Sequence, residues 1–271
     1  MPSADAFVAP EGKIFKEYNT AKDGTGTSYL PGDSYTLSGK DVVYAIWEQC
    51  YTVTIVANNQ EWGSLEGTTV IGGLIQGTPI SVTDGTVSIK EHTCTAVPNT
   101  PTAQYTYGFD HWEGIPGDYV VTKDITITAC FTRTLNTYTV TFAANDAAWG
   151  SLAGETVLRD VPYGTKVDIS GMSVTVGTKN CKAVPNGPTA QYTYGFARWD
   201  DIPDDHVITG DATITACFTR TVNTYTVTFA ANESGWGNVG RGSVENIPYG
   251  TAIDTSGSTV TVGQYSCKAT P

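Results

Sequence analysis

Tyr138-Thr-Val-Thr-Phe-Ala143 is the stretch that decides the fold, because most of it occurs three times in the chain. It recurs as Tyr51-Thr-Val-Thr54 and as Tyr225-Thr-Val-Thr-Phe-Ala230, 87 residues to either side. Apolar residues alternate with threonine, which places Tyr138, Val140 and Phe142 on one face of an extended segment. This pattern predicts a β-strand with one buried face.

The same offset relates other residues, and it divides the chain into repeats. Ala96–Phe109 matches Ala183–Phe196 except at Thr100, which corresponds to Gly187. A fixed period of this kind indicates repeated structural units. We predict two full repeats, 51–137 and 138–224. Residues 225–271 form the first half of a third repeat, and residues 1–50 form the second half of a related unit.

Each repeat is predicted to consist of short strands. Ile125, Ile127, Ala129 and Phe131 alternate with threonine and Cys130, while glycines separate further short apolar segments. No window has a convincing apolar stripe at helical spacing. Because almost no linker separates the repeats, we expect an elongated string of small domains.

Composition excludes several classes of protein. The 271 residues are 15% charged, against about 25% in an average protein, with net charge −12 and fifteen tyrosines. Aromatic content argues against disorder, and the acidic balance argues against non-specific binding to nucleic acid. No apolar run is long enough to insert into a membrane, and no secretory signal peptide is visible.

Residues 12–47 resemble the second half of a Listeria–Bacteroides repeat, also called an internalin B-repeat. Gly12-Lys-Ile-Phe-Lys-Glu-Tyr18, Tyr29-Leu-Pro-Gly-Asp33 and Tyr44-Ala-Ile-Trp47 carry the resemblance, with Tyr18 where the family has Trp. Residues 51–271 look like the divergent form, with Trp-Gly-Ser-Leu, Pro-Tyr-Gly-Thr and Ile-Thr-Ala-Cys-Phe motifs. The stretch Pro98–Phe109 is longer than in the family. The resemblance implies β-grasp-like tandem domains of secreted, prokaryotic cell-surface adhesins, with no shared catalytic residues.

Six cysteines leave two readings open. The repeats suggest one disulfide each, Cys94–Cys130 and Cys181–Cys217, closing loops of about 36 residues worth about 3–4 kcal/mol. The alternative is buried free thiols, and it is favoured by the position of Cys130 on the threonine face of its strand.

Cys50 and Cys267 have no partner in this scheme, and they lie in or beside the two half-units. Residues 8–50 of one molecule could complete the C-terminal half-repeat of the next by strand pairing, with Cys50 and Cys267 as candidates for pairing between ends. The alternative, which we favour, is a fragment cut from a longer repeat protein.

No candidate for catalysis or for a cofactor emerges. The three histidines do not recur between repeats, no nucleophile–base motif is present, and no Cys-x-x-Cys pair suggests zinc. The acidic stretch Asp200–Asp205 and the loop Asn19–Thr27 could hold calcium. Both lack EF-hand spacing, so solvated turns are the better interpretation.

Aromatic residues could form a ligand platform in each repeat. The candidates are Tyr105, Tyr107 and Trp112, with their copies Tyr192, Tyr194 and Trp199. Tyrosines of equal parity line one face of a strand and would bind glycans or proteins if exposed. Burial in the core is the favoured alternative, above all for the tryptophans.

The sequence therefore predicts a mainly β, non-catalytic tandem-repeat segment of an extracellular cell-surface protein, acting as an adhesin stalk or spacer. The alternatives are a glycan- or protein-binding module, a self-assembling subunit, and an accessory region of a secreted enzyme. Host or neighbouring-cell glycans or proteins are the expected partners.

Overall fold

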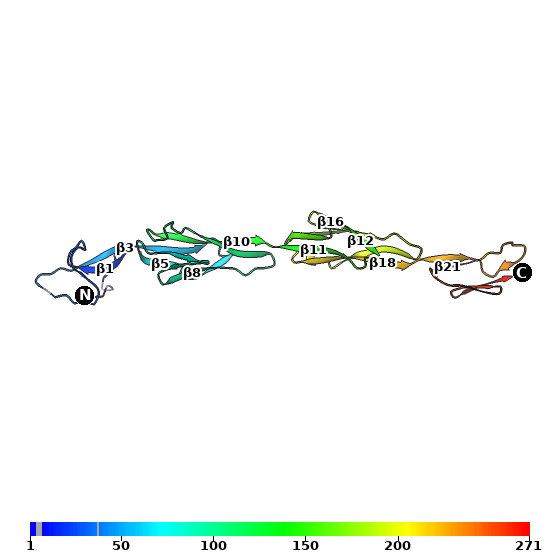
Figure 1. Ribbon diagram of the computed structural model, residues 1–271, viewed down its shortest axis with the longest axis horizontal. Coiled ribbons are helices and arrows are strands. Elements are labelled where there is room, and N and C mark those ends of the chain that lie inside the picture. The colour runs from blue at the N-terminus through cyan, green and yellow to red at the C-terminus, as the bar shows by residue number, and fades with distance from the viewer. Residues whose placement is uncertain (4–6, 37) are drawn as a thin grey trace. The chain divides into compact units, whose positions relative to one another are not determined.

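The computed structural model describes residues 1–3, 7–36 and 38–271 (Figure 1). The chain divides into two units, Met1–Leu135 and Asn136–Pro271, and each is described by itself. Strands make up most of both units. Within the described residues the helical content is one short 3₁₀ turn, η2 (Asp204–His206). The predicted mainly β class is confirmed.

The first unit contains the N-terminal segment and the first repeat. Its strands are β1 (Lys13–Asn19), β2 (Ser28–Tyr29), β3 (Tyr44–Ala57), β4 (Gly63–Gly67), β5 (Val70–Ile75), β6 (Ser81–Thr83), β7 (Thr86–Ile89), β8 (His92–Pro98), β9 (Tyr105–Glu113) and β10 (Ile125–Leu135). Strand β3 runs without a break from the N-terminal segment into the first repeat, so it belongs to both.

The second unit contains the second repeat and the start of the third. The second repeat holds β11 (Thr137–Ala144), β12 (Gly150–Gly154), β13 (Val157–Pro162), β14 (Val167–Ser170), β15 (Ser173–Val176), β16 (Lys179–Pro185), β17 (Tyr192–Asp200) and β18 (Ala212–Val222). The third holds β19 (Thr224–Thr228), β20 (Asn238–Val239), β21 (Ser243–Pro248), β22 (Ile253–Ser256), β23 (Thr259–Val262) and β24 (Tyr265–Thr270).

In the second repeat the first and last strands lie side by side. The order of the main sheet is β13-β11-β18-β17. Strands β11 and β18 are parallel, with Val140 opposite Ala212 and Ala144 opposite Ala216, while β13 and β17 run antiparallel to their neighbours. If the four strands of this sheet are numbered in chain order, their spatial order across the sheet is 2-1-4-3.

A second antiparallel sheet, β12-β16-β15-β14, supplies the other half of the core. Val140 and Phe142 of β11 are buried as the alternation predicts, and they belong to the same apolar cluster as Val174 and Cys181 of the second sheet. Complete burial of an aliphatic or aromatic side chain of this size contributes about 1.5–3 kcal/mol. The two sheets thus form a two-layer domain around a continuous core.

The first repeat is built in the same way. Its main sheet contains β5, β3, β10 and β9, and its second sheet has the order β4-β8-β7-β6. Strands β3 and β10 are parallel over Val53–Ala57 and Ile125–Ala129. Ile127, Ala129 and Phe131 are buried, as the alternation predicted.

The repeated Trp-Gly pair has a packing reason. A Cβ atom on Gly150 would lie 2.5 Å from the ring of Phe218, and Gly63 meets the ring of Phe131 in the same manner. Real Cβ atoms do not approach other atoms this closely. Only glycine therefore fits beside the Phe131 and Phe218 rings at these two positions.

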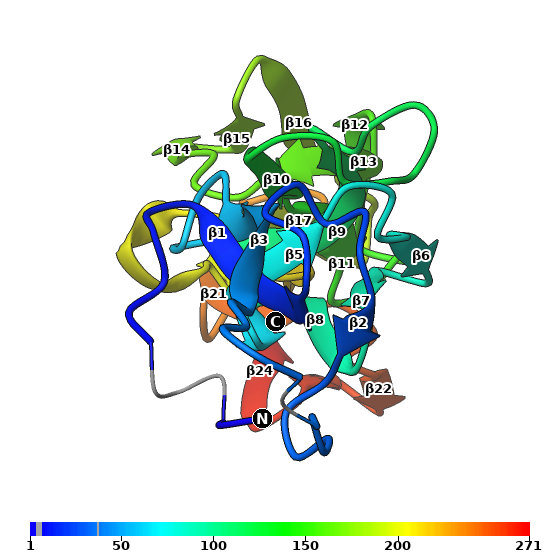
Figure 2. The ribbon, with the colours of Figure 1, turned by 90° about the vertical axis from the view of Figure 1, so that its left-hand side faces the viewer.

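The N-terminal segment forms a hairpin. Figure 2 shows β1 and β3 side by side, and they pair antiparallel with Phe15 opposite Trp47 and Tyr18 opposite Ala45. Strand β2 pairs with β1 on its other edge. The third repeat consists of the two-stranded sheet β19-β21 and the sheet β20-β24-β23-β22.

Candidate functional site

The cysteines are free thiols, which is the second of the two alternatives that the sequence left open. Cys94 of β8 and Cys181 of β16 lie in the second sheets and are fully buried in the cores. Cys130 lies between Ala129 and Phe131, which both point into the core, so its own side chain lies on the opposite face of β10. A bridge from Cys94 to Cys130 would have to cross the main sheet, and the same holds for Cys181 and Cys217.

Burial raises the pKa of the Cys94 and Cys181 thiols. Because the thiolate is the reactive form, these two groups serve as small apolar core residues.

On the outer face of the second repeat, Cys217 belongs to a small polar cluster. Its Sγ donates to Asp200 Oδ2 at 3.1 Å, and Arg198 Nε and Nη2 donate to the two oxygens of Asp200 at 2.6 and 2.8 Å. The Arg198 hydrogen bonds lower the pKa of Asp200. Burial, and then the hydrogen bond to this carboxylate, raise the pKa of Cys217. The thiol is therefore kept protonated.

The first repeat carries a weaker version of this cluster. Cys130 Sγ lies 4.0 Å from Glu113 Oε2, and burial is again the first cause that raises its pKa, followed by the charge of Glu113. His111 stands where the second repeat has Arg198, and it contacts Asp110 rather than Glu113.

Cys50 and Cys267 lie in different units. Cys50 is half-buried in β3, where its backbone N–H donates to Gly12 O and its residue pairs with Ile75 of β5. Cys267 is buried in β24, and its Sγ donates to Arg241 O at 3.4 Å. Pairing between ends stays a prediction.

The four tyrosines of the proposed platform are half-buried. The guanidinium carbon of Arg133 lies 4.3 Å from the centre of the Tyr105 ring and 5.2 Å from that of Trp62. In the second repeat, the guanidinium carbon of Arg220 lies 4.4 Å from the centre of the Tyr192 ring and 5.1 Å from that of Trp149. Each repeat thus has a stack of two aromatic rings around an arginine, a favourable cation–π arrangement. The arginine occupies one ring face that a ligand would need.

Of the two tryptophans of the proposed platform, Trp199 is a buried core residue and Trp112 is half-buried against the core. Trp199 is 6% exposed and packs on Phe142 and Phe196, with ring centres 6.3 and 5.7 Å away. Trp112 packs similarly on Phe109. Both indole nitrogens are buried without a hydrogen-bond partner. This placement agrees with the core alternative for both residues.

The loop with a calcium-like sequence is organised by a protein side chain. Asn19 is 1% exposed, its Oδ1 accepts from the backbone N–H groups of Ala21 and Gly26 at 2.9 Å, and its Nδ2 donates to Gly24 O. Within the described ranges, no group of three or more His, Cys, Asp or Glu side chains could hold a metal ion.

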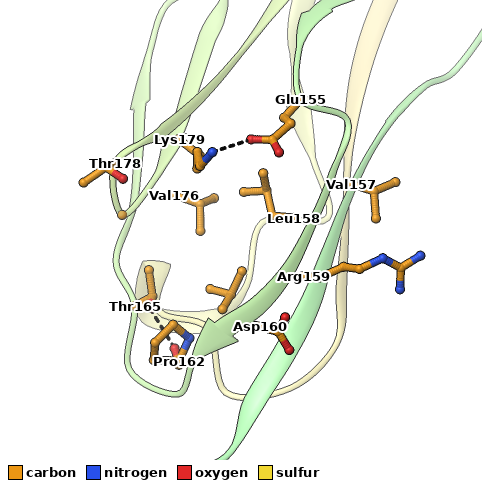
Figure 3. Close-up of a pocket in the computed structure, with 12 residues that line it drawn as sticks. Glu155, Val157, Leu158, Arg159, Asp160, Pro162, Thr165, Val176, Thr178 and Lys179 are labelled. Atoms are coloured by element: carbon orange, nitrogen blue, oxygen red, sulfur yellow. Dashed lines mark hydrogen bonds and ion pairs between the residues drawn. The ribbon is translucent and has the colours of Figure 1, made fainter.

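A cavity with a volume of about 530 Å³ lies beside β13 and β16 of the second repeat (Figure 3). Leu158, Val161 and Val176 form its apolar wall, and Lys179 Nζ lies 2.8 Å from Glu155 Oε2 at its rim. The first repeat has His92 and Thr68 at the places of Lys179 and Glu155, so this ion pair is not a shared feature.

Two asparagines that the sequence analysis did not single out connect the first and last strands of each repeat. Asn145 accepts from the backbone N–H of Phe218 at 2.9 Å and donates to its carbonyl oxygen at 3.1 Å, and its own backbone N–H donates to Ala216 O. Asn58 holds Phe131 in the same way in the first repeat. We call this arrangement the asparagine bracket. Its signal was present in the sequence, because Asn58, Asn145 and Asn232 share the 87-residue offset.

A third asparagine fixes the joint between the second repeat and the third. Asn223 is the single residue between β18 and β19. Its Nδ2 donates to Thr189 O at 2.7 Å, its Oδ1 accepts from Thr193 Oγ1 at 2.6 Å, and Tyr225 Oη donates to Ala190 O. The loop before β17 therefore holds both sides of the joint.

Comparisons with models of known families, with characterised proteins and with solved structures gave no match. No helix in the described part of the chain is long and apolar enough to cross a membrane.

Proposed function

We propose that this chain is a non-catalytic segment of a secreted cell-surface protein, in which β-grasp-like B-repeat domains act as a stalk that resists pulling. The sheet order 2-1-4-3 with strands 1 and 4 parallel supports the β-grasp assignment. In place of the helix that usually covers such a sheet, each repeat has the second antiparallel sheet.

The observation that carries the proposal is the parallel pair formed by the first and last strands of each repeat. Force on a stalk enters a repeat at the N-terminal end of β11 and leaves at the C-terminal end of β18. Because the two strands are parallel, these points lie at opposite ends of the ladder. Tension therefore shears all hydrogen bonds of the ladder together instead of opening them one by one. Five residue pairs share the load in each full repeat.

The ends of this ladder are reinforced. At one end Asp211 Oδ1 accepts from Thr139 N at 2.7 Å, and Asp124 accepts from Thr52 N in the first repeat. At the other end stands the asparagine bracket. Side-chain bonds of this kind contribute about 0.5–1.5 kcal/mol each, and they act between the two strands that tension separates.

The joints also suit a spacer. One residue separates β18 from β19, and β3 continues from the N-terminal segment into the first repeat without interruption. Within each unit, neighbouring segments are therefore connected by strands and hydrogen bonds rather than by flexible linkers.

Single-molecule force spectroscopy on the full chain tests the proposal. We expect two unfolding events of similar, high force, one for each full repeat. Each event should release the chain between the two ladder strands, roughly 77 residues from Val140 to Ala216 in the second repeat. At ~3.4 Å per residue this is ~26 nm of extended chain. Asn145→Ala should lower the force of one event and leave the other unchanged, since the first repeat keeps Asn58. Unfolding at low force without distinct events, or equal forces in the variant, would refute the shear mechanism.

A further inference from the structure

Each complete repeat contains two cysteines that point to opposite sides of its main sheet. In the second repeat, Cys181 is a residue of β16 in the second sheet, and it is fully buried in the core. Cys217 is a residue of β18 in the main sheet, between Ala216 and Phe218, which are both buried in the same core. Successive side chains of a strand point to opposite faces, so Cys217 points away from the core that contains Cys181.

The first repeat has the same arrangement. Cys94 of β8 is buried in the core, and Cys130 of β10 lies between the buried residues Ala129 and Phe131. Outside the core, the Sγ of Cys130 lies 4.0 Å from Glu113 Oε2. The placement of one thiol inside and one outside the main sheet is therefore a property of both complete repeats.

A disulfide between the two cysteines is incompatible with the folded repeat. Such a bond requires Cα atoms roughly 4.4–6.8 Å apart and Cβ atoms that point towards each other. Packed sheets lie about 10 Å apart, and the Cβ of Cys217 points away from the second sheet. Because β18 is paired with both β11 and β17, it cannot turn over without loss of the main sheet. The bond and the fold therefore exclude each other.

The fold also keeps both thiols unreactive. Burial raises the pKa of Cys181, and burial followed by the hydrogen bond to Asp200 raises the pKa of Cys217. Unfolding removes these causes and exposes both side chains, so both pKa values return to that of an ordinary thiol. Because the thiolate is the nucleophile, unfolding makes both cysteines accessible and more reactive at the same time.

The unfolded chain brings the two cysteines within reach of each other. Cys181 and Cys217 are roughly 36 residues apart in the sequence, and the cost of closing a flexible loop rises only slowly with its length. Loops of about 10 residues close in roughly 10–100 ns, so the encounter does not limit the reaction. Disulfide formation itself takes seconds or longer. The bond therefore forms in a repeat that stays unfolded for at least that time.

We propose that Cys94 and Cys130, and likewise Cys181 and Cys217, form a disulfide only in the unfolded repeat, and that this bond prevents refolding until it is reduced. The oxidant is a small disulfide. One cysteine thiolate attacks it, forms a mixed disulfide and releases a small thiolate. The second cysteine thiolate then attacks the mixed disulfide and releases the other. Two protein thiols and one small disulfide thus become one protein disulfide and two small thiols, which receive the two electrons and the two protons.

In a stalk under tension the two exchanges occur at different stages, a consequence that rests on the proposed function. The first exchange needs only one exposed cysteine and proceeds while the repeat is extended. The second needs both cysteines together and proceeds when the tension falls. A repeat that is extended for long enough in an oxidising medium thus stays unfolded after the tension is released, whereas in a reducing medium it refolds.

The experiment uses the full chain with Cys181 and Cys217 as its only cysteines, so that the first repeat is an internal control without thiols. The residues replaced by alanine are Cys50, Cys94, Cys130 and Cys267. The chain is unfolded in urea and oxidised with diamide, an azo compound that accepts the same two electrons and two protons and leaves no group on the protein. After removal of urea and diamide, hydrogen exchange with mass spectrometry measures protection in each repeat.

We expect the oxidised chain to have lost two hydrogen atoms in mass. The first repeat should regain its protection and the second should not, until a reductant is added. Without diamide, both repeats should refold. With Cys217→Ala added as the matched control, both should refold after the same treatment. The reciprocal chain, with Cys94 and Cys130 as its only cysteines, exchanges the roles of the two repeats, and protection measured before treatment verifies that each chain is folded.

Three results would overturn the proposal. These are a bond between Cys181 and Cys217 that forms in the folded chain while protection is retained, recovery of protection in the second repeat with the bond intact, and no bond in the unfolded chain. Because urea rather than force unfolds the repeats, none of these results bears on the shear mechanism, and failure of the shear mechanism leaves this experiment unaffected.

Discussion

Replacing Trp199 by alanine gives the most direct test of the core of a repeat. The side chain is 6% exposed and contacts Phe142 and Phe196 by its ring. Replacing a buried aromatic residue by alanine lowers the free energy of unfolding by about 3–5 kcal/mol, through lost burial and the cavity that remains. This figure includes the loss of the ring contacts with Phe142 and Phe196. Trp199→Phe should cost much less, because it removes the unpartnered indole N–H together with part of the ring.

Hydrogen exchange with mass spectrometry measures this effect in each repeat separately. Peptides from 157–176 and from 70–89 differ in sequence, so the second and first repeats are read in one sample. We expect the free energy of opening to fall by about 3–5 kcal/mol in the second repeat of Trp199→Ala and to stay unchanged in the first. Trp112→Ala should give the reverse. A change below about 1 kcal/mol in the affected repeat would refute the assignment of Trp199 to the core.

Two further predictions concern the ring contact and the thiol cluster. Gly150→Ala forces the Phe218 ring to move and should cost about 1–3 kcal/mol by the same exchange measurement, whereas Gly187→Ala, with open space around its Cβ, should be neutral; equal effects would contradict the contact. Asp200→Asn removes the carboxylate that helps to raise the pKa of Cys217, so alkylation of Cys217 near neutral pH should accelerate relative to Cys130 in the same chain, as measured by mass spectrometry. An unchanged ratio of the two rates would show that the carboxylate does not hold the proton on the thiol.

The alternation of apolar and threonine residues was sufficient to predict the strands, since Val140 and Phe142 are buried as expected. For the cysteines it left disulfides and free thiols open as alternatives, and the structure has free thiols. Cys130 stands between two inward residues of a strand and must face outward, whereas Cys94 faces inward. The repeat relation indicated which cysteines correspond but carried no information about which side of a sheet they share.

Contacts between distant segments could not be predicted in this way. Gly150 repeats with its tryptophan, but its cause is the ring of Phe218, which lies far along the chain. Arg133 reaches the ring of Tyr105 only because β9 and β10 pair in a particular register. Asn145 looks like an ordinary polar residue at a strand end until the last strand of the repeat lies beside it.

The parallel pairing of the first and last strands places both ends of the second repeat in one core. A domain of this topology cannot be divided in its middle without separating two strands that share a core. The cluster of buried residues in the second repeat contains Val140, Ile214 and eleven others around Phe218, whereas the third repeat retains Val244, Ile247 and Val262. The ladder that tension shears in the second repeat is therefore also held together by the core that its two strands share.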